Sequence, residues 1–201
     1  MFDALLRPII DKPLNSTARQ IVKTNLSANA ITWGGFFIGL GAALSIAQGS
    51  FLFGLILIAT NRIFDGLDGA VARLRGPTDF GGYLDIVLDF LFYSSIPFAF
   101  VVYDQSINGF AGAFLIFSFM GTGSSFLAYA IMAEKHKVTT DIRGRKSFYY
   151  LGGLTEGTET IAAFFVFCLW PEQFYWLALL FGTLCWVTTS IRILAAKNSF
   201  S

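Results

Sequence analysis

The sequence predicts an all-α integral membrane protein, with six transmembrane helices and an N-terminal amphipathic helix on the membrane surface. Of its 201 residues, 55% are apolar and only 13% are charged, whereas soluble domains carry roughly 25% charged residues. A soluble fold of this size would have to expose a large apolar patch to accommodate 23 Phe and 4 Trp. The net charge of +1 also argues against nucleic acid as a partner, because such binding depends on excess positive charge.

The first 30 residues differ from the rest, because they mix basic and apolar side chains in a stretch too polar to cross a bilayer. Arg7, Lys12, Arg19 and Lys23 alternate with leucines and isoleucines, a pattern typical of a helix lying along the membrane surface. A disordered tail is the alternative, since Pro8 and Pro13 would interrupt a helix. We therefore divide the chain into a juxtamembrane segment, 1–30, and a single membrane domain, 31–201.

Crossing the hydrocarbon core takes about 20 apolar residues per helix, and the membrane domain contains six such stretches. They are 31–48, 51–74, 80–103, 109–134, 149–169 and 172–195. With six spans, every Lys and Arg except Arg62 falls on one side of the membrane, and the other side carries only Asp104 and Glu172. The positive-inside rule makes the basic side cytosolic, so both termini are expected in the cytosol.

Four aspartates interrupt the second and third spans near their cytosolic ends. Asp65 and Asp68 are three residues apart, and Asp85 and Asp89 are four apart, so each pair lies on one helical face. The turn at Gly76-Pro77-Thr78 makes the two helices antiparallel neighbours and brings the pairs to similar depth. Each unpaired charge in a bilayer costs roughly 2.5–3.5 kcal/mol. The four carboxylates are therefore expected to converge around cations.

A ligand set made only of carboxylate oxygens favours a hard divalent ion, with Mg²⁺ first and Mn²⁺ or Ca²⁺ next. Two such ions form a common clamp for displacement at phosphorus. Glycines and alanines flank the aspartates, including Gly66, Gly69, Gly81 and Gly82. They either let a ligand approach the backbone or pack helices tightly.

These residues form Asp65-x-x-Asp68-Gly69-x-x-Ala72-Arg73, followed after seven residues by Gly81-x-x-x-Asp85-x-x-x-Asp89. The pattern fixes eight positions within 25 residues. It resembles the signature of the CDP-alcohol phosphotransferases, membrane enzymes of phospholipid synthesis with six spans. Asn29-x-x-Thr32 resembles the entry to the first span in that family, although Ala28 stands where many members have Pro.

The resemblance implies a role for each matching position. Asp65, Asp68, Asp85 and Asp89 would hold two divalent ions, and Asp89 would also accept the proton of the attacking alcohol. The CDP moiety would lie against five further residues: Asn29, Gly69, Ala72, Arg73 and Gly81. The donor would be CDP-diacylglycerol, CMP would be released, and the enzyme would be a homodimer in a bacterial inner membrane with its active site facing the cytosol.

The acceptor alcohol is less well defined by the sequence. Glycerol 3-phosphate is the favoured acceptor, and inositol phosphate, serine and phosphatidylglycerol remain alternatives. Acceptor-phosphate contacts are expected from the basic residues between spans four and five: Lys135, Arg143, Arg145 and Lys146. The alternative is that these cations only set topology. His136, Glu156 and Glu159 have no assigned role, and the run 146–160 resembles a bacterial subgroup whose acceptor is unassigned.

Two other functions fit some of these features. A membrane prenyltransferase also binds a diphosphate through Asp and Mg²⁺, but it would release pyrophosphate instead of CMP. An ion-coupled transporter also buries carboxylates, but its matching, Gly- or Pro-broken halves are not visible here.

Overall fold

The computed structural model describes residues 3–136 and 153–200, with side chains described from Lys12 onward. This part of the chain is helical and contains no strand. Its elements are α1 (Asp3–Ile21), α2 (Ala28–Ala47), α3 (Phe51–Arg75), α4 (Asp79–Tyr103), α5 (Gln105–Lys135), α6 (Gly157–Leu169), the short 3₁₀ helix η1 (Pro171–Gln173) and α7 (Phe174–Phe200).

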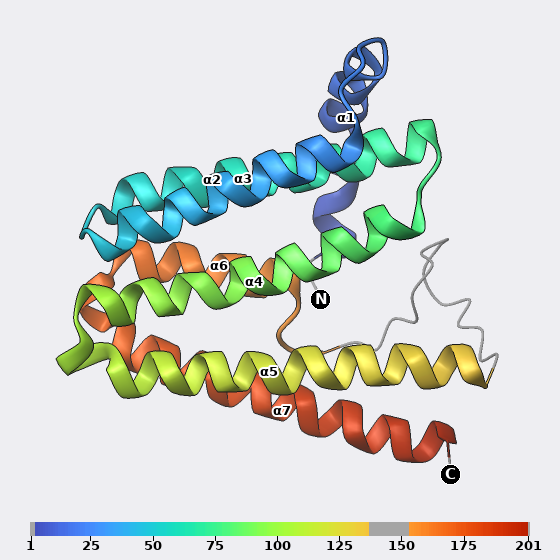
Figure 1. Ribbon diagram of the computed structural model, residues 1–201. Coiled ribbons are helices and arrows are strands. Elements are labelled where there is room, and N and C mark those ends of the chain that lie inside the picture. Colours follow the sequence, from blue (N-terminus) through green and yellow to red (C-terminus); the bar gives the residue numbers. More distant parts are fainter. Residues whose placement is uncertain (1–2, 137–152, 201) are drawn as a thin grey trace.

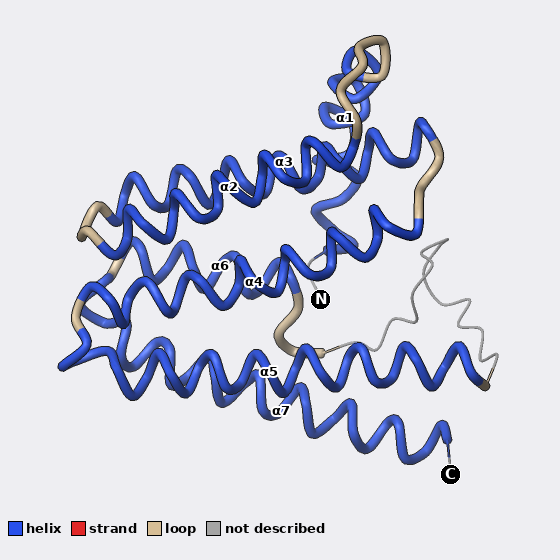
Figure 2. Tube along the Cα trace, viewed as in Figure 1, coloured by secondary structure: helices blue, strands red, loops and turns tan. Residues whose placement is uncertain are grey.

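Helices α2 to α7 form an antiparallel bundle, and α1 lies across it (Figure 1). Helices α2, α4 and α6 run in one direction, and α3, α5 and α7 return in the other. The tight turns after α2, α4 and α6 lie at one end of the bundle, as Figure 2 shows. The α3–α4 turn and the C-terminus lie at the opposite end. This is the arrangement expected from the segregation of basic residues along the sequence.

Four helices are long and apolar enough to cross a membrane: α2, α4, α5, and η1 together with α7. Helix α3 has 25 residues but carries five charged side chains between Arg62 and Arg75. Helix α6 has 13 residues, and the first part of the span predicted at 149–169 lies outside the described residues. The bundle also exposes large apolar side chains, including Phe110 at 69% and Met120 at 70%, which is typical of a surface that faces lipid.

Side-chain caps fix where several helices begin. The Ser27 hydroxyl accepts from the amide of Ala30, and the Thr78 hydroxyl accepts from the amide of Gly81. At the opposite end of the bundle, the Asp104 carboxylate caps α5 by accepting from the Ser106 hydroxyl and from a backbone amide. These hydrogen bonds hold the pKa of Asp104 below its ordinary value, because they stabilise the charged form.

The end of the bundle away from the α3–α4 turn is filled by packed aromatic rings. Phe100 stacks on Phe174 at a centroid distance of 4.2 Å, and Phe167 packs edge-on against both. Ile58 and Ile96 are fully buried in the same core. This half of the described bundle is therefore closely packed.

Helix α1 continues through Pro8 and Pro13, so the disordered-tail alternative is wrong. Its buried Ala18 packs with Ala70 and Val71 of α3 in a second, smaller core. After α1, the Arg75 guanidinium donates to three carbonyls of the following turn, including Leu26 at 2.7 Å. Arg75 of α3 thus stabilises the connection between α1 and α2.

Candidate metal and nucleotide site

The site is built on the facing surfaces of α3 and α4. The connection between them is short because Gly76 adopts a left-handed backbone with φ 100° and Thr78 starts α4 immediately afterwards. Glycine is favoured at such a φ because it has no Cβ to clash. The turn therefore places Asp65 and Asp68 of α3 opposite Asp85 and Asp89 of α4.

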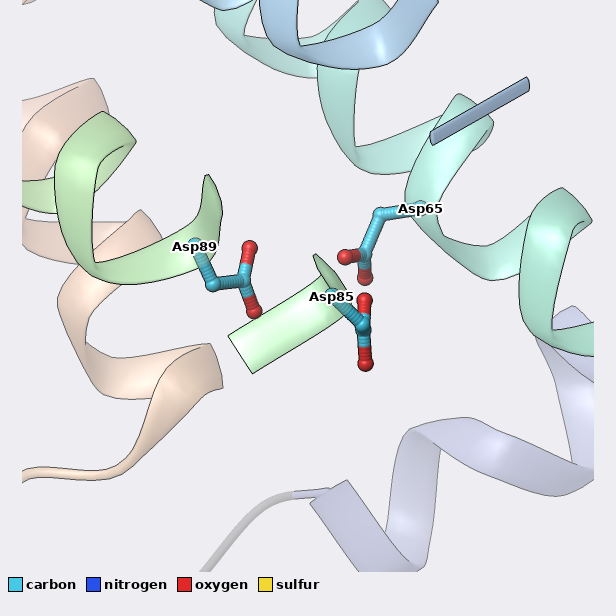
Figure 3. A group of neighbouring side chains, drawn as sticks. All are labelled: Asp65, Asp85 and Asp89. Atoms are coloured by element: carbon cyan, nitrogen blue, oxygen red, sulfur yellow. The ribbon is translucent and has the colours of Figure 1, made fainter. Parts of the chain in front are cut away.

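Three of the four aspartates meet directly. Asp65, Asp85 and Asp89 each offer a carboxylate oxygen within 4.8 Å of the others, and their side chains point toward one another in Figure 3. Asp68 is not part of this trio, but it lines the same open cavity. The predicted convergence is therefore close for three carboxylates and looser for the fourth.

The donor chemistry of this cavity fits a divalent cation. Only carboxylate oxygens form the trio, and Asp85 is exposed while Asp65 and Asp89 are half-buried, so an ion could enter from solvent. Asp68 is buried, and its Oδ2 accepts no hydrogen bond from the described residues. A buried carboxylate oxygen without a partner is costly, and a bound cation would remove that cost.

A positive side chain also lies inside this acidic site. The Nη2 of Arg62 is 3.1 Å from Asp89 Oδ1, and its Nη1 is 3.7 Å from Asp65 Oδ1. The sequence shows Arg62 as a charged residue within a predicted span but does not indicate a role for it. Its spacing of three residues from Asp65 was the available signal, because residues three apart share a helical face.

The small residues divide between ligand space and helix packing. A Cβ on Gly82 would meet nothing within 4 Å, and one on Gly69 would meet only the Arg73 guanidinium at 3.3 Å. By contrast, a Cβ on Gly66 would lie 2.6 Å from Leu14 of α1. Gly66 therefore serves packing against α1, while Gly69 and Gly82 border open space.

The expected nucleotide contacts lie toward the end of these helices where the α3–α4 turn is found. A Cβ on Gly81 would be 3.1 Å from Asn29 Oδ1, so α2 and α4 approach each other here. Ala72 is half-buried and Arg73 is exposed, one turn beyond Asp68 on α3. The residues matched to nucleotide binding thus lie on the helices that carry the aspartates or beside them, but they are not among the residues that line the acidic cavity.

A second, open cavity lies between α4, α5, α6 and α7. Two of its lining residues, Tyr93 and Arg192, were not predicted from the sequence to belong to a functional site. The Arg192 guanidinium donates to the backbone carbonyl of Thr122 at 2.9 Å. Arg62 Nη1 donates to the Tyr93 hydroxyl at 3.4 Å, so one hydrogen bond joins a residue that lines the acidic cavity to a residue that lines the second cavity.

The unassigned polar residues have structural partners. Glu156 and Glu159 form a capping box at the start of α6, and Glu156 also lines the second cavity. The His136 ring stacks near Phe200 at 5.4 Å. Lys135 is exposed in the last turn of α5 and lines neither cavity. The other predicted acceptor contacts, Arg143, Arg145 and Lys146, lie outside the described residues.

Comparison with known proteins identifies the family. Residues 25–194 match the sequence model of CDP-alcohol phosphatidyltransferases. The chain belongs to the CDP-alcohol phosphatidyltransferase family. It is therefore a phosphotransferase, and this membership favours phosphatidyl transfer over the prenyltransferase and transporter alternatives.

Relatives of this CDP-alcohol phosphatidyltransferase occur in bacteria and archaea. It is 49% identical over 193 residues to the inner membrane protein YnjF of Escherichia coli, covering 96% of this chain and 94% of YnjF. It is 43% identical over 84 residues to archaetidylinositol phosphate synthase of Methanothermobacter thermautotrophicus, covering 41% and 42% of the two chains. The relative in E. coli and the four long apolar helices together support a multi-pass inner membrane protein.

A solved structure shares the fold. Phosphatidylinositol phosphate synthase (PgsA1) of Mycobacterium tuberculosis, crystallised with CDP-DAG bound, superimposes with a TM-score of 0.71 at 21% identity, covering 91% of this chain and 92% of that one. The same enzyme in complex with manganese and citrate gives a TM-score of 0.69 at 20% identity, covering 91% and 88%. At this identity the likeness shows that the fold is common to both proteins.

Proposed function

We propose that this phosphatidyltransferase moves a phosphatidyl group from CDP-diacylglycerol to the hydroxyl of a small alcohol and releases CMP. The observation that carries the proposal is the meeting of Asp65, Asp85 and Asp89 within 4.8 Å inside the range that matches the family. The mycobacterial neighbour with CDP-DAG bound supports the choice of donor. The manganese complex of that neighbour supports a divalent metal, for which Mg²⁺ is proposed here.

The four aspartates would hold two divalent ions, with Asp65, Asp68 and Asp85 as ligands and Asp89 completing the second set. Such ions supply positive charge to a diphosphate and to its leaving group. Asn29, Gly69, Ala72, Arg73 and Gly81 would bind the CDP moiety. Arg73 is suited to the diphosphate, since a guanidinium matches phosphate oxygens with paired N–H groups.

The transfer step needs a base near the attacking hydroxyl. The hydroxyl oxygen would bond to the phosphorus that carries diacylglycerol, the bond from that phosphorus to CMP would break, and the hydroxyl proton would pass to Asp89. Asp89 suits this role because its carboxylate faces the acidic cavity and lies one helical turn from Tyr93, which lines the second cavity. The acceptor would enter from that second cavity.

Glycerol 3-phosphate remains the proposed acceptor. Inositol phosphate is the second candidate, because one relative is named archaetidylinositol phosphate synthase and the solved neighbour is a phosphatidylinositol phosphate synthase. Both are anionic, and Arg192 places a cation in the wall of the second cavity. Lys135, Arg143, Arg145 and Lys146 are proposed as further contacts for the acceptor phosphate.

The remaining proposals concern the membrane. The bundle would cross the bacterial inner membrane six times as a homodimer, with α3 and α6 completing the six spans. Both termini and the acidic cavity would face the cytosol, and α1 would lie along the membrane surface.

The test is release of CMP from CDP-diacylglycerol by the purified protein in mixed micelles, measured against glycerol 3-phosphate, inositol phosphate, serine and phosphatidylglycerol. Asp89→Asn should abolish release and still bind CDP-diacylglycerol, because Asn cannot accept the proton but retains the shape of Asp. Release of pyrophosphate from a prenyl diphosphate, or no CMP with any alcohol, would refute the proposal. Normal turnover by Asp89→Asn would refute the role of Asp89 alone.

A further inference from the structure

Arg62 is built into the acidic site by contacts on all sides of its guanidinium. Its side chain is 18% exposed, and besides Asp89 and Asp65 it contacts three uncharged groups. The Nε donates to Asn61 Oδ1 at 2.7 Å, and the Nη1 donates to the Tyr93 hydroxyl at 3.4 Å. The Cζ lies 4.7 Å from the centre of the Phe92 ring, close enough for a cation–π interaction.

These contacts hold the guanidinium independently of the carboxylates. Asn61 is itself buried, at 3% exposure, and its Nδ2 donates to the Gly35 carbonyl of α2 at 2.8 Å. The backbone of α2 therefore orients Asn61, and Asn61 orients Arg62. Movement of Asp89 toward a ligand would leave Arg62 in place, still presenting its charge to the cavity.

The position of this charge matters for any cation that shares the cavity. Three carboxylates within 4.8 Å repel one another strongly in a partly dry site. Arg62 offsets part of that repulsion when no other cation is present. For the same reason it repels an incoming divalent ion, and its hydrogen bond occupies Asp89 Oδ1.

We propose that Arg62 is a resident counter-cation that limits the affinity of the acidic site for divalent ions. The inference rests on the proposed function, because it takes the four aspartates as metal ligands. It adds a residue outside the aspartate signature that acts on the ion affinity of the site through its charge. A site of this kind holds its carboxylates together when empty and exchanges its ions readily.

The test is Mn²⁺ binding to the purified protein, titrated by electron paramagnetic resonance without substrate. Arg62→Gln removes the charge and keeps hydrogen-bonding groups, so its Kd for Mn²⁺ should be about tenfold lower than that of wild type. Arg62→Lys keeps the charge and should stay near wild type. Arg19→Gln is the matched control, since it removes one exposed cation from α1, and its Kd should not change.

A merely structural role for Arg62 predicts the opposite result, because loss of Asp89 orientation would weaken Mn²⁺ binding. An unchanged or higher Kd in Arg62→Gln would overturn the proposal. Arg62→Met provides a second neutral variant of similar length, to be used if Arg62→Gln does not fold. If wild type binds Mn²⁺ and releases CMP while Arg62→Gln gains no affinity, only this inference fails; absence of Mn²⁺ binding in wild type removes the metal proposal with it.

Discussion

Gly39 gives the sharpest test of how packing supports the site. It faces α4 from the middle of α2, and a Cβ there would lie 2.6 Å from Phe92 Cδ2 and 3.1 Å from Asn61 Nδ2. Phe92 is 1% exposed and locked in the core, so it has little room to move. Gly39→Ala would therefore push on two residues that line the acidic cavity.

The expected cost follows from two opposing effects. Replacing Gly by Ala within a helix stabilises it by up to about 1 kcal/mol, whereas overpacking a core costs typically about 1–3 kcal/mol. At Gly39 the clash should prevail, with a net loss of about 1–2 kcal/mol. For a protein of this size, each kcal/mol corresponds to a fall in Tm of roughly 2–4 °C.

Gly41→Ala is the matched control in the same helix, because a Cβ there would meet only Leu57 Cδ1 at an ordinary 3.6 Å. Thermal unfolding in detergent should show Gly39→Ala less stable than wild type and Gly41→Ala equally or more stable. Equal stability of the two variants would show that α2 and α4 are not packed as closely as the structure indicates.

Three further outcomes are expected. Asp68→Asn should raise the Kd for Mn²⁺ by about tenfold or more, because the Oδ2 of Asp68, which has no hydrogen-bond partner among the described residues, loses its charge. The electron paramagnetic resonance titration described above measures this Kd, and an unchanged value would remove Asp68 from the ligand set. Arg75→Ala should speed proteolysis of the turn after α1, since three carbonyls lose their donor, and Arg73→Ala should leave that cleavage unchanged. The pKa of Asp104 is lowered by hydrogen bonding, so its contribution to stability is present above its ordinary pKa of 3.8 and is lost as the pH falls through its lower folded value. The difference in Tm between wild type and Asp104→Ala should therefore shrink at low pH, and a difference that grew on acidification would contradict this cap.

Much of the fold follows from the sequence because helices in this protein begin and end at strong local signals. Gly49 and Gly76 mark turns with positive φ, and Thr78 and Asp104 mark helix starts. The predicted ranges of the spans therefore lie within a few residues of the helices from α2 to α5. Helix α6 begins later than predicted, at Gly157, because Glu156 caps it there.

The site was predictable to the extent that it depends on helical spacing. Spacing places Asp65 near Asp68, and Asp85 near Asp89, whereas the greater distance of Asp68 from the trio depends on how α3 is rotated against its neighbours. Arg192 could not be assigned from sequence, because its cavity is formed by four helices that are distant along the chain. Asn61 could not be assigned a role from the sequence either, because its hydrogen-bond partner is a backbone carbonyl of another helix, α2.

The apolar packing between the aspartates and the far end of the bundle affects whether ions can cross the membrane through this protein. Ile58, Ile96 and the stacked pair Phe100 and Phe174 are fully buried and form an apolar layer between the acidic cavity and the far end of the described bundle. Moving a bare charge through such a layer is prohibitively expensive. In the membrane orientation proposed above, this layer would stop a cation at the aspartates and would preserve the ion gradient across the membrane.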